Sequence, residues 1–83
     1  MIDIVVRYLG GIRMERGMEE DHLILPDGSN LHDLIEKLEA LGFDIENNDN
    51  VYILDGYGFA QYPPDQLLTT GQVVAIFPYI SGG

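Results

Sequence analysis

Residues 71–83 read GQVVAIFPYISGG. The run Val73–Phe77 has the β-branched and aromatic content of a buried strand. Pro78 has no N–H to donate to a neighbouring strand, so strand pairing is expected to end there. The residues from about 79 to 83 then form a flexible tail ending in Gly82-Gly83, which can enter a narrow channel because neither residue has a β-carbon. We therefore expect a terminal carboxylate that is delivered into another protein's active site, with a frayed chain end as the alternative.

The composition indicates one folded domain over residues 1–83. The chain has 83 residues, of which 46% are hydrophobic, and this suffices for one hydrophobic core. Fourteen acidic residues against four basic ones give a net charge of −10. That charge disfavours nucleic acid and membrane surfaces as partners and favours a protein with a basic docking surface, with acidity that serves solubility alone as the alternative.

Two further features concern location and chemistry. Asp3 lies where a signal peptide would carry basic residues, and no apolar stretch is long enough to span a membrane, so we expect a cytoplasmic protein. The chain has no cysteine. It therefore has no thiolate of its own for catalysis, metal binding or carrying sulfur.

The first half of the chain predicts a hairpin and a helix. Met1–Leu9 and Met18–Leu25 have strand character, and the glycine-bounded segment 10–17 between them is expected to be a loop. Leu31–Leu41 is the clearest helix, because its leucines and isoleucine form one apolar stripe. Asn30 is a good N-cap for this helix, and Gly42 suits the left-handed position after its end.

The second half predicts short strands separated by turns. Val51–Leu54 is a short strand that ends at Asp55-Gly56, and residues 57–65 are expected to be irregular. Gln66–Leu68 is either a turn or a very short strand, and it precedes the final strand. The whole order indicates an α+β fold in which one main helix covers one face of a mixed sheet.

No self-contained catalytic or metal site is predicted. Glu20 and His22 would face one side of a strand, with Glu19 and Asp21 on the other, so this acidic segment is interpreted as a solvated strand. His32 and Glu36 share a helical face, but one histidine and one carboxylate are a weak ligand set. The sequence Gly56-Tyr57-Gly58 is too short for a dinucleotide-binding fingerprint. The remaining aromatic residues are interpreted as core or surface-patch residues: Tyr52, Tyr57, Phe59 and Tyr62.

The α-carboxylate of Gly83 is the one reactive group with a plausible delivery device. It is ionised in the cytosol and inert toward nucleophiles. Transfer would require activation, most simply by attack on ATP to form an acyl-adenylate. The chain has no phosphate-binding loop and no cysteine, so we expect no bound cofactor, and ATP and a sulfur donor would be supplied through partner enzymes.

The ending Phe-Pro-x-x-Ser-Gly-Gly, within residues 71–83, resembles the C-terminus of ubiquitin-like sulfur carriers. The closest type is the small subunit of molybdopterin synthase (MoaD), followed by the thiamine-pathway carrier (ThiS). Leu25–Leu31 resembles that family's turn into its helix, and Asp55-Gly56 lies where many members carry Asn-Gly. Two positions differ from the common pattern, namely Gln72, where an acidic residue is common, and Tyr79, where proline or a small residue is frequent.

The resemblance implies the β-grasp (ubiquitin-like) fold and adenylation of Gly83 by an E1-like enzyme, followed by conversion to a thiocarboxylate. It implies an acceptor such as the large subunit of molybdopterin synthase and a role as a carrier rather than an enzyme. We expect these partners to bind the segment comprising Phe77, Pro78, Tyr79, Ile80, Ser81 and Gly82. Molybdopterin synthesis is the first hypothesis. The alternatives are thiazole synthesis, conjugation to target lysines as a ubiquitin-like modifier, and an interaction domain with an incidental Gly-Gly.

Overall fold

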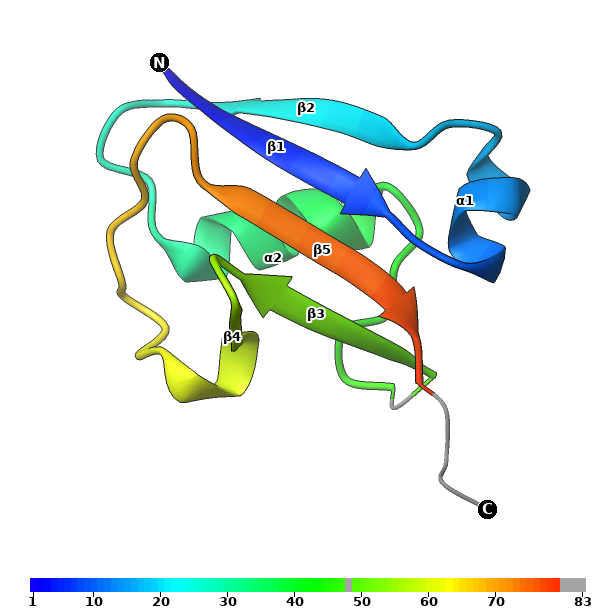
Figure 1. Cartoon of the computed structure of the whole chain (residues 1–83). Helices are drawn as coiled ribbons and strands as arrows, with labels where there is room; N and C mark the ends of the chain where they lie inside the picture. Colours follow the sequence, from blue (N-terminus) through cyan, green and yellow to red (C-terminus); the bar gives the residue numbers. More distant parts are fainter. Residues whose placement is uncertain (48, 80–83) are drawn as a thin grey trace.

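The strands form one five-stranded sheet in the computed structural model, which describes residues 1–47 and 49–79 (Figure 1). In chain order the elements are β1 (Ile2–Tyr8), α1 (Gly11–Arg16), β2 (Glu20–Leu25), α2 (Leu31–Ala40), β3 (Asn50–Leu54), β4 (Tyr57–Gly58), the 3-10 helix η1 (Phe59–Gln61) and β5 (Val73–Pro78). The strands lie side by side in the order β2-β1-β5-β3-β4. This mixed sheet with one main helix confirms the predicted α+β, β-grasp fold.

Strand β5, the last in sequence, occupies the centre of the sheet. It pairs in parallel with β1 over Val5–Tyr8 and antiparallel with β3 over Asn50–Leu54. Val74 and Ile76 are 0% exposed on the helix side of the sheet. A strand paired on both edges and buried on one face needs the apolar, β-branched sequence that this segment has.

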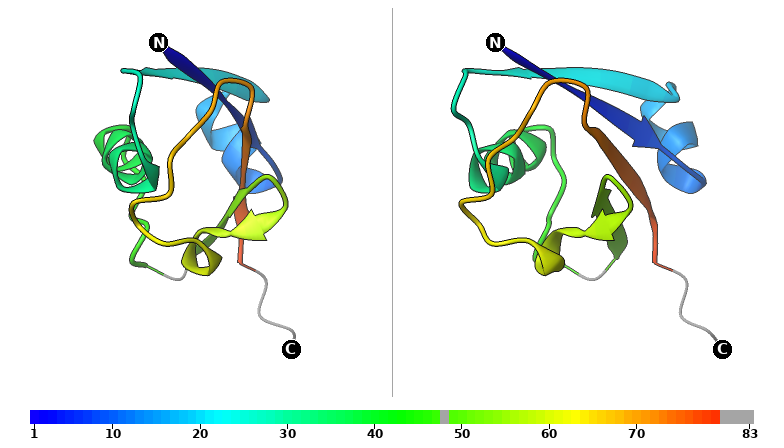
Figure 2. Two further views of the ribbon diagram at one scale, coloured as in Figure 1. Left: turned by 90° about the vertical axis from the view of Figure 1, so that its left-hand side faces the viewer. Right: turned by 60° about the vertical axis from the view of Figure 1, so that its left-hand side comes forward.

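Helix α2 covers one face of the sheet (Figure 2). Its residues Leu31, Leu34 and Leu38 are buried against the alternate residues of the strands that face it. The core consists of Ile2, Ile4, Val6, Tyr8, Ile12, Leu23, Leu25, Leu31, Leu34, Leu38, Phe43, Tyr52, Leu54, Phe59, Leu68, Val74 and Ile76. Among residues 1–47 and 49–79, no helix covers the opposite face of the sheet (Figure 2).

The predicted caps of α2 are present. The Asn30 side-chain oxygen accepts the Asp33 N–H at 3.0 Å, and the Asp33 carboxylate accepts the Asn30 N–H at 2.9 Å, which completes a capping box. The helix ends at Ala40, one residue before the predicted end, and Gly42 has a φ of 101°. That left-handed conformation favours glycine at the position where the sequence placed it.

The predicted loop at residues 10–17 is wrong, because this segment contains helix α1. Gly10 and Gly17 have φ angles of 59° and 69°, so they bound the helix instead of unwinding it. Ile12 is buried, and the Arg16 guanidinium lies over the rings of Tyr8 and Phe43, about 5 Å from each centroid. Burial of one apolar residue and a cation–π contact hold a helix too short to be stable alone.

Two smaller differences occur before the last strand. Residues 57–65 were expected to be irregular, but Tyr57–Gly58 form β4 beside β3, and η1 follows directly. The Asp55-Gly56 turn makes this pairing possible, because both residues have positive φ angles, 48° and 90°, as tight hairpin turns require. In the Gln66–Leu68 segment, Leu67 forms an isolated bridge with Asn30.

Gln72 and Asp55 are hydrogen-bonded to each other, which accounts for the unusual residue at position 72. Gln72 Nε2 donates to Asp55 Oδ2 at 3.0 Å, and Asp55 Oδ1 accepts the Val73 N–H at 3.0 Å. Gln72 Oε1 also accepts the Thr69 N–H at 2.9 Å. An amide at position 72 therefore pairs with a carboxylate at position 55. In the pattern that the sequence resembles, the two groups are exchanged, with Asn at the position of Asp55 and an acidic residue at the position of Gln72.

We predict that Asp55→Asn lowers the free energy of unfolding by about 1 kcal/mol, because two amide groups would then face each other. Asparagine tolerates the positive φ at this position, so the backbone need not change. Gln72→Glu alone should also destabilise, while the double variant should regain about 0.5–1 kcal/mol relative to the sum of the single losses. Urea unfolding of all four proteins measures this coupling, and additive losses would show that the pair does not interact.

Candidate functional site

The sequence-predicted site begins where β5 ends. Phe77 and Pro78 are the last residues of β5 and are half-buried, and Tyr79 follows them with 60% of its surface exposed. We call Pro78 and Tyr79 the tail root. The predicted site residues Ile80, Ser81, Gly82 and Gly83 lie outside the described residues, as does most of the predicted tail.

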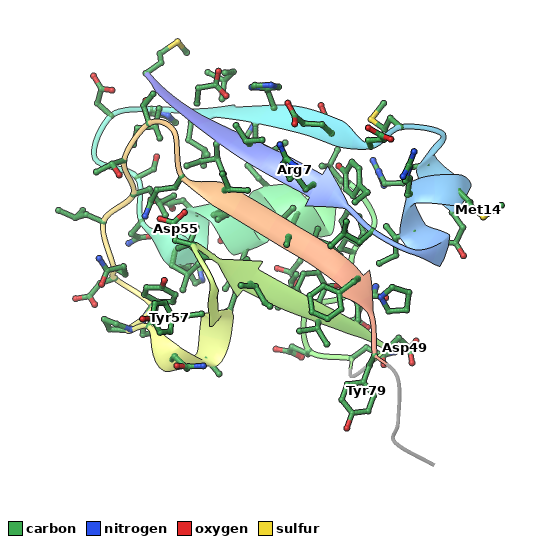
Figure 3. All side chains as sticks on the ribbon, viewed as in Figure 1. Arg7, Met14, Asp49, Asp55, Tyr57 and Tyr79 are labelled. Atoms are coloured by element: carbon green, nitrogen blue, oxygen red, sulfur yellow. The ribbon has the colours of Figure 1, made fainter. Side chains whose placement is uncertain are left out.

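Backbone hydrogen bonds hold the end of β5 on the β1 side and the tail root on the β3 side. On the β1 side, the Leu9 N–H donates to the Ile76 carbonyl at 3.0 Å. On the β3 side, the Tyr79 N–H donates to the Asp49 carbonyl at 2.8 Å, and Figure 3 shows these two residues together at the end of the strand. The direction in which the chain leaves the sheet is thus fixed through Tyr79.

Gly10 packs directly against the tail root. It has a φ of 59°, and a β-carbon added to it would lie 3.2 Å from Pro78 Cδ. Both the backbone conformation and the space therefore exclude a side chain at Gly10 without a shift of Pro78. Gly10 connects β1 to α1, so the same residue starts the short helix and receives the proline ring.

The uncovered face of the sheet carries an apolar patch that reaches the tail root. Cross-strand pairs place Val5 opposite Val73, Ile53 opposite Ala75 and Val51 opposite Phe77, and all six residues are half-buried. We call these six residues the open-face patch. A patch formed by paired β-branched and aromatic side chains on an uncovered sheet face is typical of a protein-binding surface.

A groove of about 910 Å³ lies on the other side of the tail root. It runs between α2 and the β3–η1 region and ends at Tyr79. Its lining residues are Leu31, Ile35, Ile45, Asn50, Val51, Tyr52, Gly58, Phe59, Ala60, Tyr62, Pro64 and Tyr79. None of these carries a formal charge at neutral pH, so the groove offers mainly apolar and aromatic contact surface. Tyr52 and Phe59 are core residues, as the sequence predicted.

The acidic segment before and within β2 forms an exposed ionic cluster. His22 Nδ1 lies 2.8 Å from Asp3 Oδ1, and His22 Nε2 lies 3.4 Å from Glu20 Oε1. The hydrogen bond to Asp3, with a smaller contribution from Glu20, raises the pKa of His22 above its usual value. His22 and Glu20 are largely solvent-exposed, in agreement with the predicted solvated strand.

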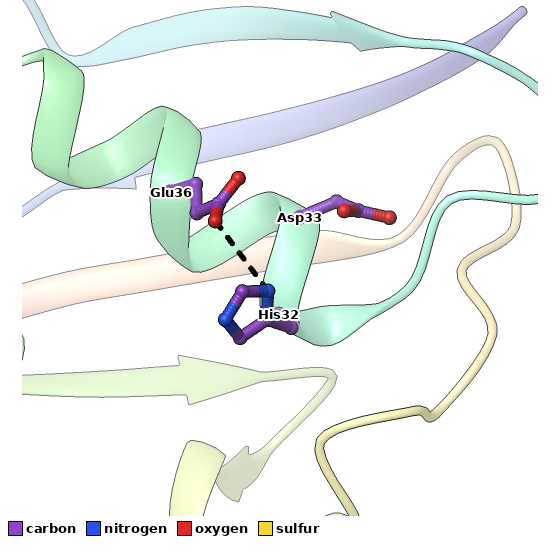
Figure 4. A group of neighbouring side chains, drawn as sticks. All are labelled: His32, Asp33 and Glu36. Carbon is purple, nitrogen blue, oxygen red and sulfur yellow. Dashed lines mark ion pairs between the residues drawn. The ribbon is translucent and has the colours of Figure 1, made fainter.

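A second group of polar residues lies at the start of α2 (Figure 4). Possible ligand atoms of His32, Asp33 and Glu36 lie within 4.8 Å of one another. His32 Nδ1 is 3.7 Å from Glu36 Oε1, and both side chains are more than 60% exposed. The Asp33 carboxylate already accepts the Asn30 N–H in the capping box. The group is accounted for as a helix cap and a surface pair, and we assign no metal site to it.

Sequence reasoning located the strand and missed what holds its end. Gly10 and Asp49 contact the tail root from segments far away in sequence. Gly10 could have been suspected from the Gly10-Gly11 pair, which breaks the alternating pattern of β1. Asp49 contributes only its carbonyl group, and any residue has one, so no sequence signal marks it. In the part of the chain that the structure describes, no helix is long and apolar enough to cross a membrane.

Comparison with known proteins bears on this geometry. The sequence model of the ThiS family matches residues 6–83. No curated protein sequence matches the chain significantly. Among solved structures, a protein from Pyrococcus furiosus described as a candidate molybdopterin converting factor, subunit 1, is similar with a TM-score of 0.71 and 25% identity. The alignment covers 96% of this chain and 100% of that one.

Two further structures have the same fold at lower identity. SAMP1 from Haloferax volcanii gives a TM-score of 0.71 at 14% identity, covering 98% of this chain and 99% of that one. A chain in the complex of subunits 1 and 2 of molybdopterin-converting factor from Helicobacter pylori gives 0.66 at 19% identity, covering 99% and 100%. The family match extends over nearly the whole sequence and includes the C-terminal glycines. The chain therefore belongs to the ThiS family of ubiquitin-like sulfur carriers.

Proposed function

We propose that this protein carries sulfur as a thiocarboxylate on its C-terminal residue, Gly83. The observation that carries the proposal is the family match through residue 83, at the end of a strand whose last residues are held rigidly by their neighbours. Phe77, Pro78, Tyr79, Ile80, Ser81 and Gly82 are proposed to contact the partners that receive this end. The protein is then a co-substrate of its partners and not itself the catalyst.

The chemistry requires two steps at the carboxylate. A carboxylate oxygen of Gly83 attacks the α-phosphorus of ATP, which forms the acyl-adenylate and releases pyrophosphate. A hydrosulfide supplied by a donor then attacks the acyl carbon and expels AMP, so one oxygen of the carboxylate is replaced by sulfur. Because the sequence has no cysteine and no phosphate-binding loop, the proposal assigns the ATP site to an E1-like adenylating enzyme and the sulfur to a separate donor.

The open-face patch is proposed to bind these partners, because it lies beside the tail root. A partner bound to the open-face patch would also lie next to the tail root, from which the chain continues to its C-terminus. The complex of subunits 1 and 2 from Helicobacter pylori supports a second enzyme subunit as the acceptor. For this chain, the proposed acceptor is the large subunit of a molybdopterin synthase, and the sulfur is used for the dithiolene of molybdopterin or tungstopterin.

A thiazole-forming carrier is the second candidate, favoured by the ThiS family match itself. The two functions use the same adenylate and differ only in the acceptor. They are separated by presenting the thiocarboxylate form to the large subunit of molybdopterin synthase with its pterin precursor, and to a thiazole synthase with its substrates. Loss of the sulfur mass in the first mixture alone would support the molybdopterin role.

Removal of Gly83 should abolish sulfur loading while leaving the free energy of unfolding within about 0.5 kcal/mol, because the last strand already ends at Pro78. One extra residue after Gly83 should have the same effect. Intact mass spectrometry after incubation with the E1-like enzyme, ATP and a sulfur donor follows the oxygen-to-sulfur exchange. Normal loading of the shortened chain would refute the assignment of Gly83.

Gly10→Ala should slow sulfur loading by a few-fold, because the added methyl group would lie 3.2 Å from Pro78 Cδ and would push the proline ring aside by a fraction of an ångström, and rates are sensitive to such displacements. The positive φ should also cost about 1–3 kcal/mol of stability, so rates are compared at a temperature where both proteins are folded. Gly11→Ala is the matched control, since nothing lies within 4 Å of its added β-carbon. Equal rates for the two folded variants would mean that Pro78 does not control delivery of the tail.

Electrostatic attraction and apolar contact should contribute to docking on the E1-like enzyme in ways that can be measured separately. Raising the salt concentration to about 0.5 M should reduce the association rate with the E1-like enzyme, because the Debye length falls below ~5 Å and screens the acidic surface. Phe77→Ala should instead raise the dissociation rate by about tenfold or more, because it removes an apolar contact of the open-face patch. Stopped-flow association and dissociation measurements distinguish the two. A salt-independent association rate would remove the electrostatic contribution, and an unchanged dissociation rate would exclude Phe77 from the interface.

A further inference from the structure

Strand β2 forms one edge of the sheet and pairs only with β1 (Figure 1). The Tyr8 N–H donates to the Glu19 carbonyl at 2.8 Å, while the Val5 and Leu9 N–H groups donate to the β5 side. Even-numbered residues of β1 thus face β2. By the antiparallel register, the backbone groups of Glu20, His22 and Ile24 point away from the sheet.

The two halves of this edge differ. In the first half, Asp21 Oδ1 accepts the outward N–H of His22 at 2.8 Å, and charged side chains surround it. The Asp21 carboxylate thus already accepts the backbone N–H that an added strand would need as a hydrogen-bond donor. In the second half, Ile24 is 44% exposed, and within the described residues its amide has no acceptor. The strand remains available for pairing only around Ile24.

A groove of about 480 Å³ lies on the helix side of this free half. Leu25, Pro26 and Ala40 contribute apolar surface, and Asp27, Asp33 and Glu36 contribute carboxylates. Lys37 is the one basic residue among those that line it. The groove is therefore acidic at its rim and apolar in part of its floor, and it would receive alternate side chains of a strand placed beside β2.

We propose that the β2 edge around Ile24 binds an extended peptide segment of a partner as an added strand. The segment carries alternating apolar side chains, because one face of it meets the groove and the other meets the exposed Ile24 side chain. It carries lysine or arginine at its ends, because the three carboxylates of the groove outnumber the Lys37 ammonium group and the Met1 ammonium group, which lies 2.7 Å from Asp27 Oδ1.

This surface is separate from the tail root, because β1 lies between β2 and β5. A partner could hold the protein by this edge while the tail and the open-face patch engage an active site. The inference therefore goes beyond the proposed sulfur-carrier function, and it holds or fails independently of it. A flexible basic segment of an enzyme could retain the carrier through successive loading and transfer steps.

The test uses two capped peptides, KKVTVIVKK and its counterpart EEVTVIVEE, titrated into the ¹⁵N-labelled full-length protein. The lysine peptide should shift the Ile24 amide and slow its hydrogen exchange, and it should bind at least about threefold more tightly than the glutamate peptide. Ile24→Pro removes an outward N–H, which an edge strand tolerates, together with part of the exposed side chain, and should weaken binding by about tenfold. Ile24→Val keeps the N–H and should stay within about twofold of the natural protein.

A charge variant keeps the test decisive if Ile24→Pro does not fold. Glu36→Lys, at the groove, should weaken the lysine peptide by about threefold, while Glu39→Lys, a matched charge change outside the groove, should not. The proposal is overturned if the peptides shift the tail root instead of β2, if Glu36→Lys and Glu39→Lys behave alike, or if Ile24→Pro folds and binds normally. Sedimentation showing dimers that Ile24→Pro removes would assign the edge to a second copy of this chain and also overturn it.

Discussion

The central position of β5 is the constraint on which the rest of the structure depends. A strand paired on both sides and covered by α2 on one face has no freedom to slide, because a shift of one residue would move Val74 and Ile76 out of the core. The tail root is held in place with it, because the Tyr79 N–H donates to the Asp49 carbonyl. Helix α2 and strands β1 and β3 surround β5 and keep it in register.

Because the end of β5 is fixed in the sheet, the two connecting segments that contact it also have defined positions. Gly10 receives the Pro78 ring, and the Asp49 carbonyl receives the Tyr79 N–H. In the core, aromatic rings form a continuous row. Tyr8 stacks on Phe43, Phe43 contacts Tyr52, and Tyr52 contacts Phe59. The row of rings extends from the α1 side of the molecule to the η1 side, so the segments on both sides of the tail root pack against the same aromatic layer.

The sequence predicted the elements whose signals are local. Helix α2 has its apolar stripe and caps within a few consecutive residues, and β5 has a continuous apolar run. Helix α1 was missed because its stabilisation comes from Ile12 burial and from Arg16 stacking on rings that are distant in sequence. The reactive group at Gly83 stays a prediction from the sequence. The contacts that orient the tail root are made by segments far away in sequence, and the Asp49 contact uses only a backbone carbonyl, which leaves no residue-type signature.

The sheet order also has a consequence for synthesis. The strand at the centre is the last of the described strands in sequence, and β1 and β3 each lack one neighbour until it pairs with them. The sheet therefore closes only after β5 has been synthesised, through contacts between segments that are far apart in sequence. A product truncated before β5 lacks the middle of its sheet, so we expect chaperones and proteases to treat it as unfolded. The architecture thus makes an intact β5 a condition of folding, and enzymes that bind the folded surface would encounter few chains cut before this strand.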